Sequence, residues 1–185
     1  MPDAKIELVS NGDPLNHQRM RKLFDAGLST LLISAYDDES QVLFFNNMAK
    51  EAGIDKSKYV IRPRWLSEKE SFGITLNNRS GALSNAEFVI EPLKEPLKQQ
   101  CNYPFYNFFM DYNGDVLMCS HDWGKKNILG NLKNENFLDI WLNNKTQTAR
   151  NRLNSADREF KPCNVCDVEG DLIGKTHYEA WKKIS

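Results

Sequence analysis

The chain has 185 residues and a mass of 21.3 kDa, enough for one large domain or two small ones. Its hydrophobic share of 41% and aromatic share of 11% exclude a generally disordered chain. With 24 basic and 25 acidic side chains the net charge is −1, and phosphate binding usually requires a basic excess, so nucleic acid is not an expected partner. No apolar run reaches the ~20 residues of a membrane span, and residues 1–5 lack the core of a signal peptide. We therefore expect a cytoplasmic protein that does not bind membranes.

The first third of the chain is predicted to alternate strands and helices. Strands are expected at residues 6–10, 29–35 and 59–64, from their short apolar runs. The first helix is expected to start with Asp13 as its cap and to end at Gly27. The second is expected to start at Asp37 or Asp38 and to end at Gly53. Strands that alternate with helices indicate βαβ units and hence a parallel sheet.

The character of the sequence changes near residue 95. A further strand is expected at 72–76, and the proline- and charge-rich stretch 91–96 indicates a linker. We therefore predict two domains, residues 1–95 and 96–185. The second should open with an aromatic strand at 104–111, turn at Asn113-Gly114 and return over 116–119. Short helices are expected around 137–141 and 149–153 and in the last ten residues.

All four cysteines lie in the C-terminal half. They are Cys101, Cys119, Cys163 and Cys166, with 17, 43 and two residues between successive members. The C-x-x-C spacing lets two thiolates converge on one centre, and a hairpin would bring Cys101 close to Cys119. With no export signal, thiols are favoured over disulfides. The pattern predicts one Cys₄ site, whose occupant on spacing alone is either zinc or an iron–sulfur cluster, with unrelated thiols as the third interpretation.

The cysteine pattern resembles the SPASM/Twitch auxiliary domain of radical SAM enzymes. Cys101, twelve residues, Gly114, four residues and Cys119 have that domain's opening form, C-x(9–15)-G-x(4)-C. Further resemblances are the C-x-x-D step at 119–122, the G-N-hydrophobic step at 130–132, the short helix at 137–141, Arg150 and the closing C-x-x-C. No cysteine follows Cys166, so the resemblance is to the single-cluster Twitch form. It implies one 4Fe–4S cluster with Cys101, Cys119, Cys163 and Cys166 as its ligands and no open iron for a substrate.

The N-terminal half resembles the later part of a radical SAM barrel. The segments that carry this resemblance are Ser10-Asn11-Gly12, the strand 32–36 and the N-R-x-G loop at 77–81. The resemblance implies a partial parallel (β/α) barrel in which Ser34 faces the SAM cofactor; the other interpretation is a strand-end hydroxyl bonded to backbone. Arg62 and Arg64 share one strand face, either to bind an anionic group or to cover the open side of the sheet with charge.

One other side chain is a candidate for the site. His121 lies two residues after Cys119. It is either a ligand or donor to the site or an exposed loop residue.

The chain lacks the C-x-x-x-C-x-x-C loop that holds the SAM-cleaving cluster of this family. We therefore expect the C-terminal part of a radical SAM enzyme, whose auxiliary cluster serves electron transfer or substrate positioning. The isolated chain should not cleave SAM, we assign no catalytic residue, and SAM binding requires N-terminal strands that complete the barrel. Partners implied by the resemblance are an N-terminal barrel fragment, a peptide substrate or another protein chain, and the family's substrates also include small polyols. The alternative is a non-catalytic Cys₄ module, stabilised by zinc or a cluster, that binds a partner protein.

Overall fold

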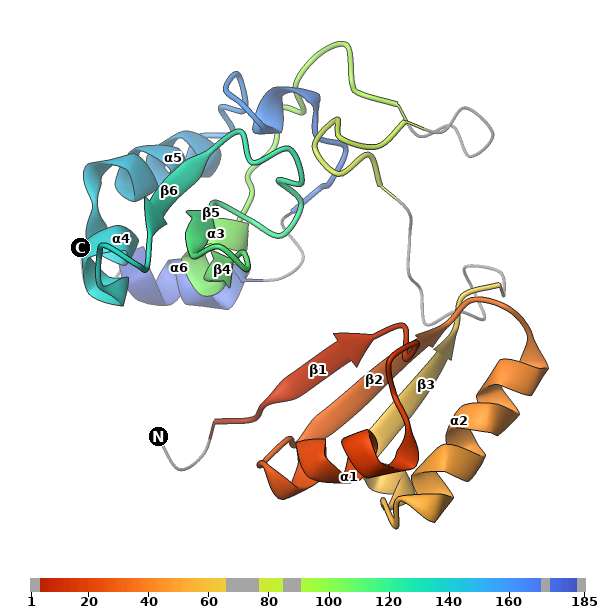
Figure 1. Cartoon of the computed structure of the whole chain (residues 1–185). Helices are drawn as coiled ribbons and strands as arrows, with labels where there is room; N and C mark the ends of the chain where they lie inside the picture. The colour runs from red at the N-terminus through yellow and green to blue at the C-terminus, as the bar shows by residue number, and fades with distance from the viewer. Residues whose placement is uncertain (1–3, 66–76, 85–90, 171–173, 183–185) are drawn as a thin grey trace. The chain divides into compact units, whose positions relative to one another are not determined.

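The computed structural model describes residues 4–65, 77–84, 91–170 and 174–182, which Figure 1 shows in colour. The chain divides into two compact units, Met1–Thr75 and Leu76–Ser185. The sequence placed the boundary later, near residue 95. In the structure, the backbone N–H of Asn78 donates to Asp167 Oδ2 at 2.9 Å, and the N–H of Leu93 donates to the carbonyl of Val165 at 3.2 Å. Residues 77–84 and 91–96 thus belong to the C-terminal unit, where Asn78 and Leu93 contact residues 165–167.

The first unit contains a parallel three-stranded sheet in the order β1-β2-β3. Its elements are β1 (Glu7–Ser10), α1 (His17–Asp25), β2 (Thr30–Ala35), α2 (Glu39–Glu51), the 3₁₀ turn η1 (Lys56–Lys58) and β3 (Tyr59–Pro63). The parallel pairing of the first two strands, Val9 opposite Leu32, confirms the predicted βαβ arrangement. The expected strand at 72–76 lies outside the described residues.

Both helices of the first unit pack on one face of the sheet (Figure 1). Met20 of α1 and Phe45 of α2 belong to one buried cluster with Leu31 and Ile33 of β2. Because β2 is the central strand, five of its six residues are buried, as expected for a strand covered by neighbours on both sides. The other face therefore consists of the alternate residues of each strand, which include Ser34.

The helix caps confirm one prediction and correct another. Asp38 caps α2 as expected, since its side chain accepts a hydrogen bond from the N–H of Ser40. The cap of α1 is Asn16, not Asp13, and the helix begins at His17. The carboxylate of Asp13 instead accepts a hydrogen bond from the side chain of Asn11 in the preceding turn. A local side-chain bond thus delays the start of the helix.

The second unit combines a small antiparallel sheet, in the order β4-β5-β6, with short helices. Its elements are α3 (Tyr103–Tyr106), β4 (Phe109–Met110), β5 (Asp115–Leu117), β6 (Ile128–Asn131), α4 (Phe137–Leu142), α5 (Asn144–Asn154), the 3₁₀ turn η3 (Cys163–Val165) and α6 (Lys175–Lys182). Within the described ranges neither sheet closes into a barrel. No helix among the described residues is both long enough and apolar enough to span a membrane.

The structure corrects the prediction of one aromatic strand over residues 104–111. A helical turn, α3, occupies 103–106, and only Phe109 and Met110 pair with β5. Pro104 in the first turn favours the helix, because its missing N–H would be unbonded there in any case. The sequence also missed β6, in which Gly130 pairs with Val116.

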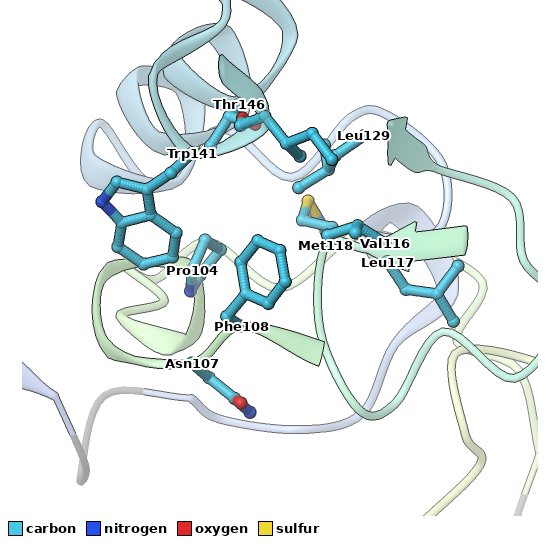
Figure 2. A pocket seen from close by; sticks show the side chains of 10 residues that line it. Pro104, Asn107, Phe108, Val116, Leu117, Met118, Leu129, Trp141 and Thr146 are labelled. Carbon is cyan, nitrogen blue, oxygen red and sulfur yellow. The ribbon is translucent and has the colours of Figure 1, made fainter. Parts of the chain in front are cut away.

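An apolar cavity lies between α3, the sheet and α4 (Figure 2). Phe108 and Trp141 lie on one side of it, and Met118 and Leu129 on the other. Pro104 and Met118 line this cavity and also the one that contains the cysteines. Two residues that line the apolar cavity of this unit therefore also line the cavity that contains the cysteines.

Candidate metal centre

All four cysteines line one cavity of the second unit. Cys101 precedes α3, Cys119 follows β5, and Cys163 and Cys166 belong to the turn η3 and its end. Their thiols form no disulfide, and all except the half-buried Cys101 are 7–9% exposed. The predicted convergence of the four side chains is thus present in the structure, from three segments that are far apart in the sequence.

The first two cysteines are brought close by the β4–β5 hairpin. Gly114 takes a φ of 89° at the turn, which favours glycine, and its N–H donates to the carbonyl of Asp111 at 2.9 Å. The side-chain oxygen of Asn113 accepts the N–H of Asp115, as expected for an Asx turn. This local chemistry sets the reversal of the chain between Cys101 and Cys119.

The loop after Cys119 is folded by a buried carboxylate. Asp122 is 1% exposed, and its two oxygens accept the N–H groups of Lys126 and Asn127 at 3.0 and 2.8 Å. The C-x-x-D step therefore has a structural role in this chain. The same turn directs the backbone N–H of His121 to the sulfur of Cys119.

His121 lies at the rim of the cavity and is half-buried rather than exposed. Its ring meets the edge of Tyr103 at 5.2 Å between centroids, and its Nδ1 lies 3.3 Å from Arg79 Nη1. Burial, followed by the charge of Arg79, lowers the pKa of His121, so the imidazole is neutral near pH 7. Arg79 also packs over the ring of Trp123 at 4.9 Å.

The C-x-x-C turn is held by Asn78, which lies in the N-R-x-G loop of residues 77–81. This side chain is fully buried and donates to the carbonyls of Val165 and Glu91 at 2.6 and 3.0 Å. Its oxygen accepts the N–H of Gly81 at 3.2 Å. The N-R-x-G resemblance marks Asn78 in the sequence, but its partner at Val165 lies 87 positions away, so the local sequence does not show which turn it supports.

The buried thiols are poor acids without a metal. Burial, and then the neighbouring sulfurs, raise the pKa of Cys119 to about 12 and raise that of Cys163 as well. At neutral pH both are protonated, so any metal or cluster that they bind must displace their protons.

The two predicted occupants require different spacings of the cysteine sulfurs. Among the described residues, no three His, Cys, Asp or Glu side chains are grouped closely enough to hold a single metal ion. Tetrahedral zinc with Zn–S bonds of ~2.3 Å needs sulfurs only about 3.8 Å apart. In a 4Fe–4S cluster each of the four thiolates binds a different iron, which sets the sulfurs wider apart than around one zinc ion. The four cysteines line one cavity, and both occupants would draw on their thiolates.

Comparison with known proteins favours an iron–sulfur cluster over zinc as the occupant of the site. The family model of SPASM, described as an iron–sulfur cluster-binding domain, matches residues 101–167. The match begins at Cys101 and includes all four cysteines.

Residues 101–167 form a SPASM domain.

Other matches extend over most of the chain. It is 27% identical over 173 residues to the S-adenosyl-L-methionine-dependent 2-deoxy-scyllo-inosamine dehydrogenase of Niallia circulans, a match that covers 91% of this chain. The crystal structure of BtrN in complex with AdoMet and 2-DOIA matches 90% of the chain with a TM-score of 0.67 and 22% identity. BtrN in an open conformation matches 93% with a TM-score of 0.57 and 19% identity. The chain and these proteins share the fold on both sides of the SPASM boundary.

The chain spans only part of the length of these relatives: 64% of the curated dehydrogenase and 61% of the BtrN chain. The fold that it shares with them includes the parallel sheet of the first unit.

Ser34 lies in the first unit, whereas all four cysteines belong to the second. Its side chain is 4% exposed, and its Oγ accepts hydrogen bonds from Arg64 Nε and Nη2 at 3.2 and 3.1 Å. Arg64 Nη1 is buried with no hydrogen-bond partner among the described residues. Arg62 is paired in register with Ser34 on the neighbouring strand. The residue predicted to face SAM therefore orients an arginine.

Proposed function

We propose that Cys101, Cys119, Cys163 and Cys166 hold one 4Fe–4S cluster. We further propose that the chain is the cluster-bearing C-terminal part of a radical SAM enzyme. The observation that carries this proposal is the cavity that all four cysteines of the chain line. The match of residues 101–167 to SPASM supports it.

With all four thiolates engaged, such a cluster has no open iron for a substrate. When bound, it supplies a one-electron acceptor or relay beside the substrate pocket. The chain's residues limit the access of water to it: three of the four cysteines are buried, and Met118 and Pro104 lie between this cavity and the neighbouring apolar cavity. We propose an electron-transfer role on this basis, in a SAM-dependent radical oxidation of a small polyol like the substrate named for the relative from Niallia circulans.

The first unit is proposed to contribute the later strands of a barrel that binds SAM. Its β1 strand is an edge of the described sheet, and the side chain of Val9 on it is 59% exposed. Preceding barrel strands, in the same or another chain, would pair with this edge. Ser34 would then act by holding Arg64, whose unpartnered Nη1 suits an anionic group such as the carboxylate of SAM.

Anaerobic reconstitution with iron and sulfide tests the cluster. We expect about four iron and four sulfide per chain and a broad brown visible absorption. Replacing any one of the four cysteines by alanine should lower the iron content, whereas the control Ser34→Ala, in the other unit, should leave it unchanged. A colourless protein that binds about one zinc per chain would overturn the proposal in favour of a zinc-stabilised module.

A further inference from the structure

Arg158 is a buried arginine beside the cysteine cavity. Its side chain is 2% exposed, and its guanidinium donates only to backbone carbonyls. Nε donates to Gln99 at 2.9 Å, Nη1 to Val168 at 2.7 Å, and Nη2 to Gln100 at 3.0 Å and to Glu169. The side chain thus joins two chain segments that are about seventy positions apart.

Those two segments carry cluster ligands at their ends. The carbonyls of Gln99 and Gln100 directly precede Cys101, and the other two follow shortly after Cys166. A further backbone bond, from the N–H of Asn102 to the carbonyl of Gly170 at 2.8 Å, joins the same segments. Arg158 therefore fixes the segment that carries Cys101 relative to the segment that carries Cys166.

The charge of this arginine has no acidic partner in the described part of the chain, where no ion pair includes it. A buried cation without a counter-charge is costly, even when carbonyl dipoles surround it. The protein retains the charge at a position that lines the same cavity as all four cysteines. Such placement indicates that an anion balances it when the site is complete.

The guanidinium lies directly against the site. A Cβ at Gly170 would lie 2.4 Å from Cys101 Sγ and 3.4 Å from Arg158 Nη2, so the sulfur and the guanidinium flank the same point. This position, together with the shared lining of the cavity, puts the positive charge within electrostatic reach of the cysteine sulfurs.

We propose that Arg158 is the buried counter-charge of the iron–sulfur cluster, a positioning residue that raises the cluster's reduction potential while it joins the two ligand-bearing segments. The inference rests on the proposed function, because it needs the cluster. A cubane with four thiolate ligands is an anion, and it gains one more negative charge when it is reduced. A fixed positive charge stabilises the reduced form more than the oxidised form, so it shifts the potential upwards.

The test compares Arg158→Gln, which removes the charge, with Arg158→Lys, which keeps it but loses the planar fork of donors. The full chain is reconstituted anaerobically, and the midpoint potential is measured by a redox titration followed by electron paramagnetic resonance. For Arg158→Gln we expect the ratio of reduced to oxidised cluster at a fixed potential to fall at least tenfold, a shift of 59 mV for one electron. Arg158→Lys should stay within threefold of the parent ratio.

Arg150 provides the matched control. It is also buried, at 5% exposed, and donates to the carbonyls of Pro104 and Trp141 at 3.0 and 2.8 Å, but it does not line the cysteine cavity. Arg150→Gln should lower the melting temperature without moving the potential.

The outcomes separate the two proposals. A parent protein that takes up no iron refutes the proposed function. A parent that loads its cluster, with an Arg158→Gln potential equal to that of the Arg150→Gln control, refutes the counter-charge. If Arg158→Gln does not fold, Arg158→Lys decides: a loaded cluster at the parent potential supports the role of the charge, and a shifted potential or an empty site overturns it.

Discussion

Gly170 is the position at which a single added methyl group should damage the metal site most directly. Its φ of 78° lies in the left-handed region, where a side chain costs about 1–2 kcal/mol. An alanine Cβ would lie 2.4 Å from the sulfur of Cys101 and 3.2 Å from its Cβ, closer than real contacts allow. Crowding of this kind in a packed interior costs about 1–3 kcal/mol. Gly170→Ala should therefore lower the free energy of unfolding by about 2–5 kcal/mol.

The contact also predicts a specific loss at the site, because relief of the clash requires Cys101 to move away from the other three sulfurs. The assay is urea unfolding followed by circular dichroism, together with iron bound per chain after reconstitution. Gly27→Ala is the control, since Gly27 has a φ of 102° but no atom within 4 Å of an added Cβ. It should show only the backbone cost, about 1–2 kcal/mol, with normal iron content. Equal destabilisation of both variants, with full iron in each, would refute the reasoning.

Three further predictions concern the C-x-x-C support, the thiols and catalysis. Asn78→Ala should destabilise the second unit by about 1–3 kcal/mol, since it removes the buried donor to the carbonyls of Val165 and Glu91, and chemical unfolding measures it. In the metal-free protein, the raised pKa of Cys119 means that its stabilising contribution is complete below about pH 9 and is lost as the pH rises towards 12. Stability should therefore fall by about 1.4 kcal/mol per pH unit per buried thiol above pH 9, and Cys119→Ser should reduce that slope; a slope identical to that of the parent contradicts the prediction. The isolated chain should produce no 5′-deoxyadenosine from SAM under reducing conditions, which chromatography after anaerobic reconstitution checks; turnover would show that the four cysteines do not all serve one auxiliary site.

Local signals in the sequence were sufficient for the elements of the first unit. The strand runs and the Asp38 cap depend on residues adjacent in the chain, so the parallel sheet and α2 are where the sequence predicts them. The same locality explains the errors. Asp13 bonds to Asn11 instead of capping α1, and Pro104 starts a helical turn inside a segment that has the composition of a strand. In both cases two local preferences competed, and composition does not say which prevails.

The sequence by itself also predicted the ligand set, because the four cysteines have SPASM spacings and lie within the SPASM match of residues 101–167. Tertiary structure alone decided what supports those ligands. Asn78 holds the C-x-x-C turn, Arg158 joins the segments beside Cys101 and Cys166, and Gly170 leaves room for the sulfur of Cys101. The physical reason is that these three residues act on backbone or side-chain atoms brought close only by folding. A buried asparagine or arginine bonded to distant carbonyls has the same local sequence as an exposed one.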